Sequence, residues 1–122
     1  HAPTWRYRNL LRTAAMDGAL MSPHELDVAL AFGNIEAAAG LNGGTPETHE
    51  VSRVLRATWA AFARSGDPAN ATIPTWPAYD GERKVLLISP TPRVADGDVD
   101  GAALAVAGGL SDRMIDWFGV FS

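Results

Sequence analysis

His24 and Asp27 are the two side chains whose types and spacing predict chemistry in this sequence. A neutral imidazole accepts a proton near neutral pH, which makes histidine the commonest general base in enzymes. His24 follows Pro23 in an expected loop, and the apolar run after Asp27 would hold that loop rigidly. Asp27 is a candidate to orient the ring, but an acid near the start of a helix is equally expected as compensation for the helix dipole. The pattern indicates a general base, and an idle loop histidine is the alternative.

A nucleophile to accompany this base is missing from the sequence. None of the serines lies in the Gly-x-Ser-x-Gly turn that strains a nucleophilic serine into position. No stretch resembles the glycine-rich strand-to-helix turn that cradles phosphate groups. The chain has no cysteine, which excludes thiol nucleophiles, disulfides and thiolate metal sites within it. These residues alone therefore do not make a complete active site.

An acidic run over residues 96–101 matches a metal-binding loop in part. Asp96, Asp98, Asp100 and Gly101 match the first half of a calcium-binding loop, but the twelfth position is Ala107 instead of the required glutamate. We interpret the run as a solvated acidic turn. The three histidines also lack zinc-like spacing. The sequence predicts no metal and no other cofactor.

Composition limits the class of protein. The 122 residues suffice for one domain, and their net charge of −4 with scattered basic residues argues against binding to nucleic acid. No apolar stretch is long enough to cross a membrane, so we expect a soluble protein, with the cytoplasm slightly favoured. Asn70-Ala71-Thr72 is a glycosylation acceptor triplet, which is relevant only to a secreted chain. The chain enters strand-like sequence at once, and we expect it to be a piece of a longer protein.

Hydrophobic periodicity predicts the first elements. Aromatic side chains alternate with arginines over residues 3–8, as in a half-buried strand, and a short helical turn is expected over 10–15. Residues 24–32 fit both a strand and a short helix. Glycines over 40–44 predict a flexible connection. A helix of about twenty residues should follow, because Thr45 is a suitable N-cap, Pro46 suits the first turn and Gly66 suits the end.

The second half of the chain contains weaker signals. Residues 70–83 are expected to form a proline-rich surface loop, and residues 85–88 form an apolar run typical of a buried strand. Prolines and glycines predict that residues 90–109 are rich in loops. A short helix over 111–119 is expected, with Ser111 as its cap and Leu110 stapled against Ile115.

Three segments together resemble the C-terminal region of the type B carboxylesterases, which include the bacterial para-nitrobenzyl esterases and the cholinesterases. They read HELDVALAFGN, TWAAFARSGDP and WPAYD. Members of the family show His-x-x-Asp/Glu before an apolar stretch and Phe-Gly-Asn, then a helix ending in Gly-Asp-Pro and a Trp-Pro-x-Tyr segment. Order and approximate spacing agree across residues 24–80. One departure is that four residues, instead of one, separate Gly18-Ala19 from His24.

The resemblance implies a fold and a set of roles. The chain would be the C-terminal part of an α/β hydrolase, with two strands from the sheet edge and their covering helices. His24 would be the histidine of a Ser-His-acid triad, Asp27 would belong to the hydrogen-bond network behind the site, and Leu26 would lie near the substrate pocket. The missing N-terminal portion would carry the serine, the triad acid and the oxyanion-hole amides.

Two readings follow for function. In the first, the chain is part of a serine carboxylesterase acting on small-molecule esters, and these 122 residues alone are inactive. In the second, it belongs to a carboxylesterase-like module that has lost catalysis and serves protein interaction. A small independent α+β binding domain fits the truncated start less well.

Overall fold

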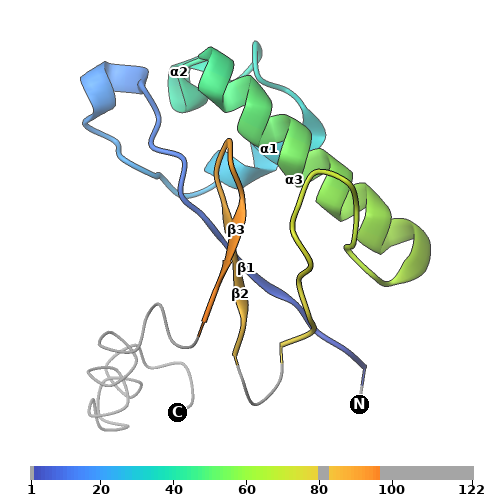
Figure 1. The fold of residues 1–122 in the computed structure, drawn as a ribbon. Helices are drawn as coiled ribbons and strands as arrows, with labels where there is room; N and C mark the ends of the chain where they lie inside the picture. Colours follow the sequence, from blue (N-terminus) through green and yellow to red (C-terminus); the bar gives the residue numbers. More distant parts are fainter. Residues whose placement is uncertain (1, 80–82, 97–122) are drawn as a thin grey trace, which may run out of the picture.

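The computed structural model describes residues 2–79 and 83–96 (Figure 1). Its elements in chain order are β1 (Arg6–Asn9), a 3-10 turn η1 (Ala15–Gly18), α1 (Leu26–Phe32), α2 (Ala39–Asn42), α3 (Pro46–Ser65), β2 (Val85–Ile88) and β3 (Arg93–Ala95). The predicted helix at 111–119 and most of the acidic run lie outside the described residues. Within the described part, no helix combines the length and the apolar character needed to cross a lipid bilayer.

The sheet has the order β1-β2-β3, with β2 in the middle. β1 and β2 run parallel, and β3 returns antiparallel to β2. All four residues of β2 are buried, which explains its uninterrupted apolar sequence. β3 corrects one expectation, because the sheet contains a third strand, which lies within the segment 90–109. Residues 97–109 of that segment lie outside the described residues. β1 also begins at Arg6, later than the predicted strand over 3–8.

α3 agrees with its prediction. The Thr45 hydroxyl accepts a hydrogen bond from the Thr48 amide at 3.2 Å, and Gly66 ends the helix with φ of +74°. The N-terminal part of its apolar stripe is buried, with Val51, Val54 and Leu55 each fully inaccessible to solvent. The stripe is incompletely covered toward the C-terminus, where large aromatic side chains remain exposed.

α1 resolves the ambiguity over residues 24–32 in favour of a helix. Leu26 and Leu30 lie four residues apart and are buried, whereas Val28 and Phe32, also four apart, are 54% and 74% exposed. The helix packs across α3, where the Ser52 hydroxyl donates a hydrogen bond to the Leu30 carbonyl at 2.7 Å. A seven-residue helix is unstable in isolation, so this packing is what maintains it.

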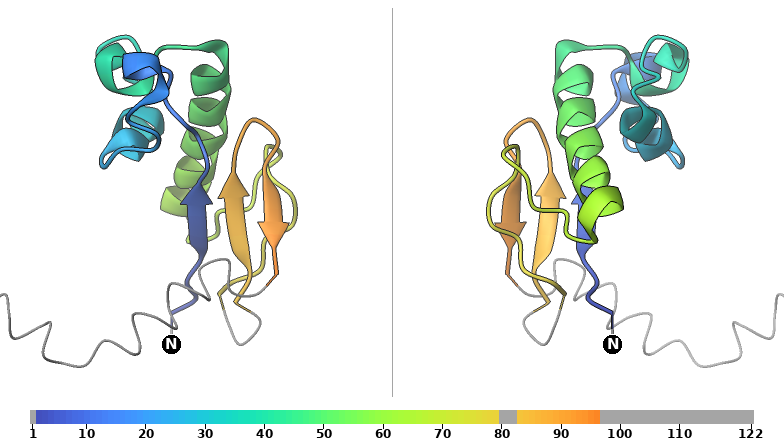
Figure 2. Two further views of the ribbon diagram at one scale, coloured as in Figure 1. Left: turned by 90° about the vertical axis from the view of Figure 1, so that its left-hand side faces the viewer. Right: turned by 90° about the vertical axis from the view of Figure 1, so that its right-hand side faces the viewer.

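One core joins the helices to the sheet. α3 lies against one face of the sheet, while η1, α1 and α2 gather beyond the end toward which β1 and β2 point (Figure 2). The fully or largely buried side chains of this core are Leu11, Leu26, Leu30, Ile35, Val51, Val54, Leu55, Trp76, Leu86 and Ile88. The segment that carries His24 therefore follows the carboxyl end of a parallel strand, the edge where α/β sheets place their ligands.

The glycosylation triplet closes a loop after α3. The Asn70 side-chain amide donates to the Thr58 hydroxyl at 3.2 Å and to the Pro68 carbonyl at 2.9 Å. Its oxygen accepts from the Thr72 amide at 2.8 Å and from the Thr72 hydroxyl at 2.6 Å. Asn70 thus ties this loop to α3.

The connection from α2 to α3 is held by backbone and side-chain contacts. The predicted flexible segment 40–44 instead contains the end of α2 and the fully buried Asn42. The Asn42 amide donates to the Ile35 carbonyl at 2.9 Å, and its oxygen accepts from the Gly44 amide at 2.8 Å. Gly43 has φ of +78°, and a Cβ there would lie 2.9 Å from the Ala14 nitrogen. The absence of a side chain at Gly43 therefore allows the backbone of the segment before His24 to lie against this position.

Substitution of Gly43 tests this close contact. We expect Gly43→Ala to lower the free energy of unfolding by about 1–3 kcal/mol more than Gly66→Ala does. Both positions have a positive φ, so alanine introduces backbone strain at each of them. Only Gly43→Ala adds a steric clash, because a Cβ at Gly66 meets nothing within 4 Å. Urea denaturation of the two variants measures the difference. Equal losses would show that the loop moves away from position 43 at no cost.

Candidate active site around His24

Buried Thr13 anchors the loop that contains His24. Its amide donates to the Met21 carbonyl at 2.8 Å, and its hydroxyl accepts from the Ala15 amide at 3.0 Å. Thr13 is only 2% exposed, so these bonds lie out of contact with water. The loop is therefore closed on itself just before the histidine.

Unusual backbone angles surround His24. Met21 has φ of +55° and Glu25, the residue immediately before α1, has φ of +67°. Four of the five non-glycine residues with positive φ in the described part of the chain lie between positions 16 and 25. Such conformations cost about 1–3 kcal/mol each and cluster at active sites, where surrounding structure holds them. This observation favours a functional role for the loop.

The His24 side chain is exposed to solvent. Among residues 2–79 and 83–96, no hydrogen bond or ion pair engages its ring. The imidazole is therefore available to an external group, as a general base requires. Ser22, two residues earlier, is also exposed and makes no hydrogen bond to the ring within that part of the chain.

Asp27 contacts the sheet instead of the histidine. The Tyr7 hydroxyl donates to Asp27 Oδ2 at 3.3 Å, which links β1 to the first turn of α1. Burial raises the pKa of Tyr7, and the nearby negative charge of Asp27 acts in the same direction, whereas the Trp59 indole opposes it. Within the described residues, Asp27 thus holds the helix that follows His24, and no hydrogen bond joins its carboxylate to the imidazole ring.

Leu26 lies in the core. Its side chain is 2% exposed and packs with the residues that join α1 to α3. It lines neither of the two clefts that open next to β1. The structure therefore gives Leu26 a packing role beneath the histidine loop.

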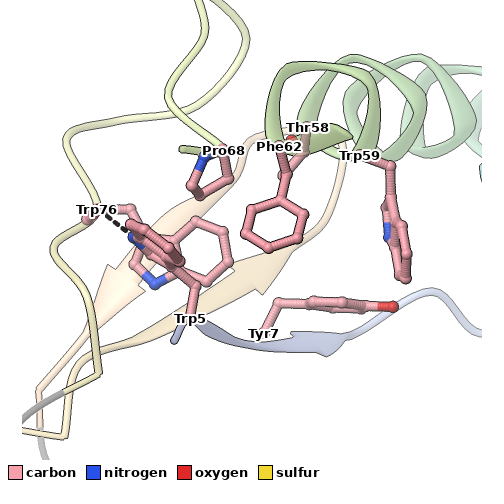
Figure 3. A pocket seen from close by; sticks show the side chains of 7 residues that line it. All are labelled: Trp5, Tyr7, Thr58, Trp59, Phe62, Pro68 and Trp76. Carbon is pink, nitrogen blue, oxygen red and sulfur yellow. Dashed lines mark hydrogen bonds between the residues drawn. The ribbon is translucent and has the colours of Figure 1, made fainter. Parts of the chain in front are cut away.

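Two neighbouring clefts open between α3 and β1, and α1 bounds the larger one while the loop after α3 bounds the smaller one. The larger, about 490 Å³, is lined by Tyr7, Asp27, Val28, Ala31, Phe32, Arg56, Trp59, Ala60 and Ala63. The smaller, about 190 Å³, is lined mainly by aromatic side chains, namely Trp5, Tyr7, Trp59, Phe62 and Trp76, with Thr58 and Pro68 (Figure 3). Sequence reasoning missed both clefts, because their residues come from segments far apart in the chain.

The carboxylates and histidines of the described residues are scattered. Within the described residues, no three His, Asp or Glu side chains gather closely enough to hold a metal ion.

Comparison with known proteins places these features in a family. The model of the carboxylesterase family matches residues 1–104. The chain belongs to the carboxylesterase family. It is 32% identical over 76 residues to phenmedipham hydrolase of Pseudarthrobacter oxydans, covering 59% of this chain and 15% of the hydrolase. It is 28% identical over 96 residues to para-nitrobenzyl esterase of Bacillus subtilis, covering 72% of this chain and 18% of that esterase.

A solved structure confirms the fold. The carboxylesterase of Geobacillus stearothermophilus superposes with a TM-score of 0.67 at 28% identity, over 84% of this chain and 21% of its own. This carboxylesterase-family chain therefore has part of an α/β-hydrolase fold, as the sequence predicts. It spans less than a quarter of the length of each of these three proteins.

The strained Glu25 yields one test. We expect Glu25→Gly to leave the free energy of unfolding unchanged or raise it by up to about 1 kcal/mol, since glycine adopts positive φ without strain. The same substitution at Glu47, in the first turn of α3, should lower it by about 1 kcal/mol. Urea denaturation measures both. A clear loss at Glu25 would show that its side chain makes a contact that outweighs the strain.

The raised pKa of Tyr7 yields a second test. Because the folded state holds the phenolic proton more tightly than the unfolded state, the associated stability is present below the unfolded pKa of about 10 and is lost as pH rises through the folded value. We expect the free energy of unfolding to fall above about pH 10 more steeply in the wild type than in Tyr7→Phe. Parallel curves for the two proteins would exclude a contribution from Tyr7.

Proposed function

We propose that this chain is the C-terminal part of a serine carboxylesterase and that His24 is the general base of its triad. The observation that carries the proposal is the position of His24, exposed on a strained loop beyond the carboxyl end of β1. Family membership supports ester hydrolysis as the reaction. The order of the resembling motifs supports His24 as the histidine within that reaction.

The proposed chemistry proceeds in two proton transfers for each half of the reaction. His24 takes the proton from a serine hydroxyl as the serine oxygen attacks the ester carbonyl, and returns it to the departing alcohol. It then takes a proton from water, which attacks the acyl-enzyme, and returns that proton to the serine. Backbone amides of an oxyanion hole stabilise the negative charge that develops on the carbonyl oxygen.

The groups that complete the site lie in polypeptide outside these residues. We assign the nucleophilic serine, the triad acid and the oxyanion donors to that polypeptide, because no Gly-x-Ser-x-Gly turn occurs in the 122 residues. The chain alone then lacks both nucleophile and oxyanion stabilisation. It should not hydrolyse esters faster than free imidazole at the same concentration.

Asp27 and Leu26 support the base in this proposal without touching the substrate. The Tyr7 to Asp27 hydrogen bond fixes α1 to the sheet, and buried Leu26 fixes the same helix turn to the core. Together they hold the backbone on the C-terminal side of His24. We assign them positioning roles and leave the proton transfers to His24.

Replacement of His24 tests the proposal. In the protein expressed from its whole reading frame, we expect His24→Ala to lower kcat/KM for para-nitrophenyl acetate by about ten-thousand-fold or more, because the serine loses its base. His49→Ala is the matched control, since His49 is a half-exposed histidine on α3, and it should keep activity within about threefold.

Two outcomes would contradict the assignment. Equal activity of the wild type and His24→Ala would exclude His24 as the base. Inactivity of both, in a wild type that is shown to be folded, would instead favour the non-catalytic interaction module.

A further inference from the structure

Met21 carries an exposed apolar side chain on the loop that leads to His24. It is 52% exposed, so the described residues do not bury it as part of the core. Its backbone has φ of +55°, a conformation that glycine adopts without strain and that a residue with a bulky side chain rarely adopts. The chain therefore keeps a large side chain where it costs stability and where the described residues leave half of it exposed. Strain of this kind is concentrated at functional sites.

Backbone hydrogen bonds fix Met21 on both sides. Its amide donates to the Gly18 carbonyl at 3.1 Å, and its carbonyl accepts from the amide of buried Thr13 at 2.8 Å. The Pro23 carbonyl accepts from the amide of Leu26, the first residue of α1, at 3.3 Å. The short segment from Met21 to α1 is therefore held at both ends.

Met21 lies within reach of a group bound at His24. The two residues are three positions apart, and three residues of chain span at most about 11 Å. Both side chains are exposed. A methionine side chain has three rotatable bonds, so it adapts its shape to an apolar group beside it. Met21 can therefore contact a substituent that extends from an atom held by the imidazole.

The proposed proton transfers decide which part of an ester lies beside this loop. His24 returns a proton to the departing alcohol, so the alcohol oxygen must come within about 3 Å of the imidazole. The acyl carbon bonds to the serine, and its carbonyl oxygen lies among the oxyanion donors, all of which we assign to other polypeptide. The alcohol substituent is thus the part of the substrate nearest to the loop that carries His24.

We infer that Met21 determines specificity for the alcohol half of the ester, by contacting the alcohol substituent while His24 protonates its oxygen. A thioether favours apolar groups and makes attractive contacts with aromatic rings. The preferred substrates are therefore esters of apolar, ring-bearing alcohols. The stretch between Ala19 and His24 is also where this chain departs from the family motif, with four residues in place of one. The contact is thus a property of this chain and not of the motif.

The inference rests on the proposed function, because His24 meets an alcohol oxygen only as the base of an esterase. Its test compares substrates that differ in one half alone. Benzyl acetate and methyl acetate share their acyl group, whereas methyl hexanoate and methyl acetate share their alcohol. The measured quantity is the ratio of two kcat/KM values from one preparation, followed by titration of the released acid. Such a ratio does not depend on the fraction of the preparation that is folded.

Met21→Ala is the test variant, because alanine keeps a Cβ and with it the backbone preference at this position. In the protein expressed from its whole reading frame, we expect the ratio of kcat/KM for benzyl acetate to that for methyl acetate to fall about fivefold or more. The ratio for methyl hexanoate to methyl acetate should change by less than about twofold, because the acyl chain does not meet Met21. Met21→Leu conserves volume and apolar character, so it should keep the benzyl ratio within about twofold of the wild type.

Met16→Ala is the matched control. Met16 also has a positive φ, of +52°, and is 69% exposed, but it lies on η1, eight positions before His24. We expect it to leave both ratios unchanged. The same fall of the benzyl ratio in Met16→Ala would overturn the inference, because it would reflect a rearrangement of the whole loop.

The remaining outcomes separate the inference from the proposed function. An unchanged benzyl ratio in an active Met21→Ala variant overturns the inference and leaves the esterase assignment standing. An equal fall of the benzyl and hexanoate ratios also overturns it, because Met21 would then act on the site as a whole. A folded wild type that hydrolyses none of the three esters contradicts both.

Discussion

The packing of α1 across α3 is the contact on which the candidate site depends. α1 has only seven residues and follows a residue with positive φ, so neither its length nor its start stabilises it. Leu26 and Leu30 bury their side chains in the shared core, and the Ser52 hydroxyl satisfies the Leu30 carbonyl. The Tyr7 hydroxyl holds the same helix from the sheet side. The rigidity of the loop that carries His24 therefore depends on the packing of α1 against α3 and β1.

The fold was predictable where the signals are local. Thr45, Pro46 and Gly66 mark both ends of α3, and the structure confirms them. α1 was ambiguous because its apolar residues satisfy the two-residue and the 3.6-residue periods together, and only contact with α3 decides between them. β3 was missed because its three residues become a strand through pairing with β2, while the flanking Pro90 and Pro92 indicate a turn.

The candidate site was predictable in part. Three short segments, one of which contains His24, together resemble the family, which the comparison confirms, and the role of His24 stays a prediction. The partner of Asp27 could not be read from the sequence, because Tyr7 lies 20 positions away on a strand. The exposure of Trp59 was also hidden. Trp59 belongs to the same apolar stripe of α3 as buried Leu55. The stripe in the sequence does not show how far along the helix other elements pack against it.

The loop closed by Asn70 has a consequence for attachment of sugar. Each of the two amide hydrogens on its side-chain nitrogen has an acceptor, the Thr58 hydroxyl and the Pro68 carbonyl. An N-linked glycan replaces one of these hydrogens, so the two hydrogen bonds cannot both form when Asn70 carries a glycan. An oligosaccharide would therefore have to be attached to Asn70 before the chain folds. The loop after α3 would then fold with a different set of hydrogen bonds.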